Sequence, residues 1–167
     1  MPALILLRHG KSDWDADDGG EDRARPLARR GRKAARRMGR FMARAGQVPD
    51  AAITSPAVRA ADTLRLAMEG GGWSCPVRSA ASLYGGGVPG MLAEVQQEPA
   101  DTGVLLAVGH EPTSSETLSA LVGGGEVRLP TAALARIDFD VDRWEEVAPG
   151  TGVLAWLVVP RLLAGNG

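Results

Sequence analysis

The sequence predicts an α/β protein, a three-layer sandwich in which helices cover both faces of a mostly parallel central sheet. Strand-like runs alternate with helical segments through the first two-thirds of the chain, which favours parallel strands joined by helices. The clearest strand runs are continuously apolar, as expected of strands buried on both faces. A length of 167 residues with no repeat or long linker fits a single domain over residues 1–167.

The first expected strand is residues 3–7, an apolar run that ends directly before Arg8-His9-Gly10. Residues 13–22 are rich in aspartate and glycine, so we expect a loop there. An Asp13-x-Asp15-x-Asp17 pattern in it resembles a calcium loop, but the glycine and final glutamate of that motif are missing. We therefore expect no metal site.

An amphipathic helix is expected after Pro26, ending at Gly46. Its apolar positions fall on one face at spacings of three and four: Ala34, Met38, Phe41, Met42 and Ala45. Its basic residues fall largely on the other: Arg32, Lys33, Arg36, Arg37, Arg40 and Arg44.

The remaining elements follow from the same patterns. Further strands are expected at residues 51–54, 77–80, 104–108, 133–138 and 153–159. Further helices are expected at residues 55–68, 89–97 and 113–122. Glycine triplets at 70–72 and 123–125 end two of these helices.

Composition narrows the setting of the protein. No apolar run is long enough to span a bilayer, and no basic segment precedes the first apolar run as in a signal peptide. The single cysteine, Cys75, cannot form an internal disulfide, which favours a reducing, cytoplasmic location. We expect no membrane partner.

Charge is unevenly distributed. Residues 1–50 hold 12 Lys/Arg and 7 Asp/Glu, a net +5, whereas residues 51–167 hold 7 and 13, a net −6. The positive half indicates an anionic ligand. The basic helix face is either simply solvated or binds an acidic protein or nucleic acid; because aromatic residues that would stack on bases are few, we expect no nucleic-acid partner.

The two histidines each come directly after a predicted strand. His9 follows residues 3–7 and His110 follows residues 104–108. Ligands of open α/β sheets bind at the carboxyl ends of the strands. Arg8 adjoins His9, and Arg59 lies near the start of a helix that follows a strand. Two arginines and two histidines converging at one point predict a phosphate pocket.

Four blocks of the sequence, in order, resemble the histidine phosphatase superfamily of phosphoglycerate mutase-like proteins, in its short SixA-type branch. The resemblance covers about residues 3–122. The blocks are Leu7-Arg8-His9-Gly10, Arg25-Pro26-Leu27 with Gly31, Ser55-Pro56-x-x-Arg59-Ala60-x-x-Thr63, and Gly109-His110-x-Pro112.

The resemblance implies a role for each matching residue. His9 would be the nucleophile and would carry the phosphoryl group, with Arg8 and Arg59 binding phosphoryl oxygens and His110 donating a further hydrogen bond. A neutral imidazole is a good nucleophile near pH 7, and its second nitrogen must be held as a donor. The arginines supply positive charge, so we expect neither metal nor cofactor. Lys11 and Ser12 follow this block and are either phosphate contacts or ordinary loop residues.

The general acid is the point at which the sequence departs from larger relatives. These carry a glutamate after the third strand, where this chain has Ser82-Leu83-Tyr84-Gly85. Glu94 lies too far along the next helix, and the candidates are Glu111 and Asp22. The alternative for each of the two is an ordinary solvent-exposed side chain. Acid catalysis typically contributes ~10²–10⁴-fold.

A phosphohistidine leaving group needs little such help. We therefore expect a phosphatase acting on protein phosphohistidine. The alternatives are a phosphatase of small phosphomonoesters and a catalytically silent phosphate-binding module.

Overall fold

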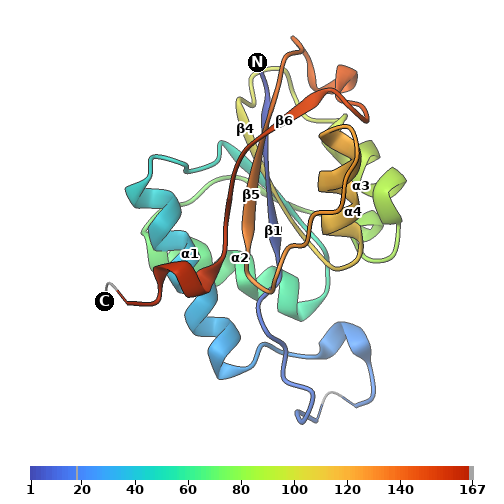
Figure 1. The fold of residues 1–167 in the computed structure, drawn as a ribbon. Coiled ribbons are helices and arrows are strands. Elements are labelled where there is room, and N and C mark those ends of the chain that lie inside the picture. Colours follow the sequence, from blue (N-terminus) through green and yellow to red (C-terminus); the bar gives the residue numbers. More distant parts are fainter. Residues whose placement is uncertain (18, 166–167) are drawn as a thin grey trace.

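The computed structural model describes residues 1–17 and 19–165, so residue 18 of the expected 13–22 loop lies outside the described residues. One sheet runs through the centre with the strand order β3-β2-β4-β1-β5-β6 (Figure 1). Its strands are β1 (Ala3–Arg8), β2 (Ala51–Thr54), β3 (Val77–Ser79), β4 (Val104–Gly109), β5 (Leu134–Phe139) and β6 (Gly152–Val158). The α-helices are α1 (Arg29–Arg44), α2 (Val58–Gly71), α3 (Gly87–Val95) and α4 (Thr113–Leu121).

Strand pairing confirms the mostly parallel sheet. The neighbours β3, β2, β4 and β1 are all parallel. Strand β5 is antiparallel to β1, and β6 is antiparallel to β5. The four parallel strands are joined through α1, α2 and α3, as the alternating pattern requires.

Two apolar cores lie on opposite faces of the sheet. In β1, Leu4 and Leu6 pack into the core that holds α3 and α4. Ile5 and Leu7 pack into the core formed with α1 and α2. Successive strand residues point to opposite faces, so a strand covered on both sides must be apolar throughout. The three-layer arrangement is therefore the cause of the continuous apolar runs.

The helix predictions are confirmed in place and corrected at their ends. Met38 and Met42 of α1 are buried as expected, but Ala45 lies beyond the helix end and is exposed. Helix α2 begins at Val58 rather than Ser55, because the Ser55 amide still bonds to the sheet at Val108. Helix α3 runs over Gly87–Val95, earlier than residues 89–97, since a proline is tolerated in a first helical turn.

Short 3-10 turns were not expected and occur at η1 (Asp22–Ala24), η2 (Ala81–Leu83), η3 (Trp144–Glu146) and η4 (Pro160–Leu163). Turn η4 lies against α1 (Figure 1). No helix in the described part of the chain is long and apolar enough to cross a membrane.

Gly31 of α1 lets the loop after β1 approach the helix closely. A Cβ atom at this position would lie 2.2 Å from the Lys11 carbonyl oxygen. The Lys11 carbonyl also accepts a hydrogen bond from the Ala28 amide at 2.8 Å. Helix α1 therefore braces the segment that follows His9.

Candidate active site

Adjacent strands deliver the two histidines to one place. Strands β1 and β4 are parallel neighbours, and their register pairs Arg8 with Gly109. The next residues, His9 and His110, therefore leave the sheet side by side, with ring centroids 5.1 Å apart. Strand β2 pairs with the other side of β4 and ends directly before Ser55, whose hydroxyl oxygen lies 2.7 Å from His110 Nε2.

His9 is oriented by backbone contacts. Its Nδ1 lies 2.7 Å from the Gly10 carbonyl oxygen, which only accepts, so Nδ1 carries the proton and Nε2 keeps a free lone pair. The Gly10 amide in turn donates to Thr63 Oγ1 at 2.9 Å. Thr63 donates to the Arg59 carbonyl one turn earlier in α2, so this helix fixes the nucleophile loop.

Both imidazoles are held in the neutral form. The pKa of His9 is lowered to about 4, mainly by burial and also by His110, Arg59 and Arg8 nearby, while the hydrogen bond with Gly10 acts in the opposite direction. Burial, followed by the charge of Arg59, lowers the pKa of His110 to about 4 as well. Near pH 7 His9 is therefore an uncharged base with an available lone pair.

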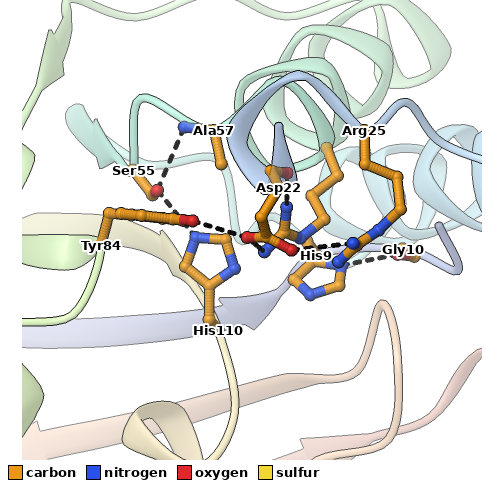
Figure 2. A network of polar contacts seen from close by, with 9 residues as sticks. His9, Gly10, Asp22, Arg25, Ser55, Ala57, Tyr84 and His110 are labelled. Atoms are coloured by element: carbon orange, nitrogen blue, oxygen red, sulfur yellow. Dashed lines mark hydrogen bonds and ion pairs between the residues drawn. The ribbon is translucent and has the colours of Figure 1, made fainter. Parts of the chain in front are cut away.

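Asp22 connects the cationic side chains of the site. Its carboxylate accepts hydrogen bonds from Arg59 at 2.9 Å and Tyr84 at 2.6 Å, and it pairs with Arg25 at 2.7 Å. Figure 2 shows this carboxylate between Arg25 and Tyr84, above the His9 and His110 rings. The second terminal nitrogen of Arg59 donates to the Asp22 carbonyl. Both terminal nitrogens of Arg59 are thus engaged by one loop residue.

Four buried nitrogens in this region have no partner among the described residues. They are the Nε atoms of Arg8, Arg25 and Arg59, and Nδ1 of His110. An unsatisfied buried donor typically costs about 1–3 kcal/mol. Only Ser114 and Thr117 contribute other unpartnered buried side-chain atoms in the described part of the chain. Three of these nitrogens belong to arginines whose charges act on His9 or His110, and the fourth belongs to His110 itself, as expected of a site for an anion.

The two candidate proton donors, Glu111 and Asp22, and the more distant Glu94 have different surroundings. The Glu111 carboxylate accepts two hydrogen bonds from Ser115, one from the Ser115 amide and one from the Ser115 hydroxyl. Glu94 is bound to Ser82 and Arg78, away from the histidines as expected. The hydrogen bond from Tyr84, together with Arg59 and Arg25, holds the pKa of the Asp22 carboxyl far below its usual range. In this conformation Asp22 has no proton to give near pH 7.

The two loop candidates take separate positions. Lys11 is exposed and lines a groove beside α1. Ser12 is buried and forms a bridge with Leu27. Arg8 donates from a terminal nitrogen to the Leu129 carbonyl at 2.9 Å, and its charge acts on His9.

Sequence reasoning did not single out Arg25, Tyr84 or Ser55 as site residues. Arg25 and Ser55 lie within blocks of the family resemblance, which was the available signal. Tyr84 stands where a carboxylate was sought, and no local pattern marks it. Its contact with Asp22 joins residues 62 positions apart.

Comparison with known proteins decides the family. The model of the histidine phosphatase superfamily (branch 1) matches residues 4–102. The chain belongs to the histidine phosphatase superfamily. A Mycobacterium tuberculosis protein of unassigned function, Rv1276c, is 32% identical over 93% of this chain and its own whole length.

Solved structures place this histidine phosphatase in the SixA-type branch. The proposed phosphohistidine phosphatase SixA of Nakamurella multipartitia is 31% identical, with a TM-score of 0.81 over 95% of this chain and 96% of that one. The protein histidine phosphatase SixA complexed with tungstate has the same fold, with a TM-score of 0.83 at 23% identity over 96% and 99% of the two chains. The protein is therefore a phosphatase with the phosphoglycerate mutase-like fold.

Proposed function

We propose that this phosphatase removes phosphate from phosphohistidine on a protein, through a phosphohistidine intermediate on His9. The observation that carries the proposal is the set of four unpartnered buried donors around a neutral, oriented imidazole. A tetrahedral oxyanion supplies the acceptors that these donors lack. The tungstate complex of a SixA with the same fold agrees with such a site.

The reaction has two displacements at phosphorus. In the first, the lone pair of His9 Nε2 forms a bond to phosphorus, and the bond from phosphorus to the substrate nitrogen breaks. The substrate imidazole leaves with the bonding electron pair and takes a proton from solvent. In the second, a water oxygen bonds to phosphorus, the bond to His9 breaks, and the water proton passes to solvent or phosphate. Phosphoryl transfer requires chiefly alignment and positive charge, which Arg8 and Arg59 supply.

His110 fits the role of hydrogen-bond donor to the transferred group. Ser55 Oγ already accepts from the Ala57 amide, so its own proton is available to His110 Nε2. His110 Nδ1 then carries a proton, and Figure 2 shows this nitrogen on the side of the ring that faces His9. Its buried, unpartnered state favours donation to a phosphoryl oxygen.

The state of the carboxylates near the site favours phosphohistidine over phosphomonoesters as the substrate. An alkoxide leaving group needs a proton in the transition state, and Asp22 is ionised while Glu111 and Glu94 are bound to serines. A substrate P–N bond is exchanged for another P–N bond on His9, so the free-energy change of the first step is close to zero.

We propose a cytoplasmic location for the enzyme, in line with its single free cysteine, Cys75.

A paired hydrolysis assay tests the proposal. The purified enzyme is given a phosphohistidine-bearing protein in one arm and an aryl phosphate or small phosphomonoesters in the other, with His9→Ala as the control. We expect a higher kcat/KM for phosphohistidine and no turnover by the variant. Faster hydrolysis of phosphomonoesters would contradict the proposed substrate, and Glu111 would then be the next residue to mutate. Retained turnover in His9→Ala, checked for folding by circular dichroism, would contradict the mechanism.

A further inference from the structure

Five cations of α1 form a single row. Their spacing of three and four residues aligns them along one face of the helix. We call this set the basic row: Arg30, Lys33, Arg37, Arg40 and Arg44. The helix has 16 residues, so at 1.5 Å per residue the row extends over roughly 20 Å.

A groove lined by the basic row and by residues of the C-terminal turn η4 lies on this side of α1; Figure 1 shows η4 against α1. The groove consists of two cavities of about 410 and 510 Å³ that share Arg37. Lys11 and Arg161 line the first cavity together with the start of the row. Apolar groups lie between the cations, among them Pro160 in the first cavity and Leu163 in the second. The groove thus combines seven cations with an apolar floor.

These cations have no counter-ion within the described residues. None of the basic row, Lys11 or Arg161 takes part in an ion pair there. By contrast, Arg36 on another face of α1 has a counter-ion, because it forms an ion pair with Glu69 of α2. No aspartate or glutamate lines either cavity. Clustered like charges attract an anionic partner and repel one another in its absence.

The groove begins beside the loop that follows the nucleophile. Lys11 follows the nucleophile by two residues and lines the first cavity. Pro130 lines the same cavity, directly after Leu129, whose carbonyl accepts from Arg8. A chain segment with its phosphorylated side chain at His9 can therefore continue past Lys11 and along α1.

We propose that this groove docks an acidic segment of the phosphoprotein substrate, next to the phosphorylated side chain. The inference rests on the proposed function. Seven unpaired cations match a run of carboxylates, and the apolar floor suits side chains between them. Nucleic acid fits less well, because base stacking needs a free aromatic ring and Phe41 already packs edge-on against Trp156 at 5.8 Å. A membrane surface fits less well, because Met38 and Met42 of α1 are buried.

Two synthetic peptides, each with one phosphohistidine, test the proposal. One carries a flanking run of glutamates and the other the same run of glutamines, and free phosphohistidine is the substrate without a flank. The groove variant is Lys33→Gln/Arg40→Gln, and the control variant is Arg65→Gln/Arg143→Gln, which removes two exposed cations elsewhere. Both variants change the net charge equally.

We expect the parent enzyme to prefer the glutamate peptide by about tenfold in kcat/KM at low salt, since each exposed ion pair contributes modestly. The preference should shrink in the groove variant, persist in the control variant and fall with added salt. Free phosphohistidine should be hydrolysed equally by all three proteins. Equal turnover of both peptides by the parent enzyme would overturn the docking groove, and so would an equal loss of preference in the two variants.

A binding measurement separates failure of the groove from failure of the proposed function. If no phosphohistidine compound is hydrolysed, the proposed function fails. Fluorescence anisotropy with labelled, unphosphorylated forms of the two peptides then tests the groove itself. Tighter binding of the glutamate form, lost only in the groove variant, supports the groove. Equal binding of both forms overturns it, as does tighter binding of a labelled single-stranded oligonucleotide, which would favour nucleic acid.

Discussion

His9 acts as a nucleophile only while its imidazole is neutral, and its surroundings extend the pH range in which that holds. Burial, followed by the nearby cationic groups, lowers its pKa to about 4 from an ordinary value of 6.5. The protonated form loses the lone pair on Nε2, so activity is lost as pH falls through the pKa. The pKa of the neighbouring His110 is lowered in the same direction, so both rings are neutral near pH 7.

We therefore expect kcat/KM for an acid-stable aryl phosphate to stay level from about pH 8 to pH 6 and to fall toward pH 4. The rates are corrected for the ionisation of the substrate itself. A profile already half lost at pH 6.5 would show that His9 titrates as an ordinary, solvated histidine.

Asp22 accepts hydrogen bonds from the Arg59 guanidinium group, which would also bind a phosphoryl oxygen of the substrate. Both terminal nitrogens of Arg59 donate to this one residue, so an oxyanion that binds the nitrogen paired with the carboxylate must displace that carboxylate. Replacing Asp22→Asn removes the competing charge, and we expect vanadate to inhibit the variant at several-fold lower concentration. Tyr84→Phe, which removes one hydrogen bond to the carboxylate, should change inhibition less. Weaker vanadate inhibition in Asp22→Asn would instead show that the carboxylate positions Arg59 for binding.

At the scale of the elements, α2 holds the nucleophile loop through Thr63. Its hydroxyl accepts from the Gly10 amide and donates to the Arg59 carbonyl, and the side chain is fully buried. Thr63→Val leaves the Gly10 amide without a partner, which typically costs about 1–3 kcal/mol.

We expect the Thr63→Val variant to unfold at lower denaturant concentration. We also expect its kcat to fall by a larger factor than its KM rises, because the loop no longer holds His9 in line with the phosphorus atom and the leaving group. Thr63→Ser keeps the hydroxyl and should retain most of both properties. A Thr63→Val enzyme with unchanged kcat would contradict the role of α2 in positioning His9.

Element prediction from the sequence succeeded where burial imposes a period. The continuous apolar runs of β1 and β4 predicted a sheet that is covered on both faces. The spacing of Met38 and Met42 predicted the buried face of α1. The pairing of His9 with His110 was also predictable, because both follow strands. The cluster of Asp22, Arg25 and Tyr84 was not, since it joins loops whose sequences carry no period. Its geometry depends on how those loops fold over the strand ends.

At the scale of the whole molecule, positive charge gathers at the active site and along α1. The charges of Arg8 and Arg59 act on His9, and those of Arg59 and Arg25 act on His110. The basic row carries further positive charge along α1. The guanidinium groups of Arg8, Arg25 and Arg59 can balance the charge on a transferring phosphoryl group. We expect EDTA to leave the hydrolysis rate unchanged; a loss of activity that an added divalent metal restores would contradict this assignment.

The central claim, transfer of the phosphoryl group to His9, is tested most directly by trapping the intermediate. The enzyme is mixed with a phosphohistidine protein, quenched in alkali within the first turnover and mapped by mass spectrometry. The account predicts one phosphoryl group on the peptide that contains His9, labile to acid, and none in His9→Ala. A phosphoryl group on His110 or another residue, or full turnover with no labelled enzyme, would contradict it.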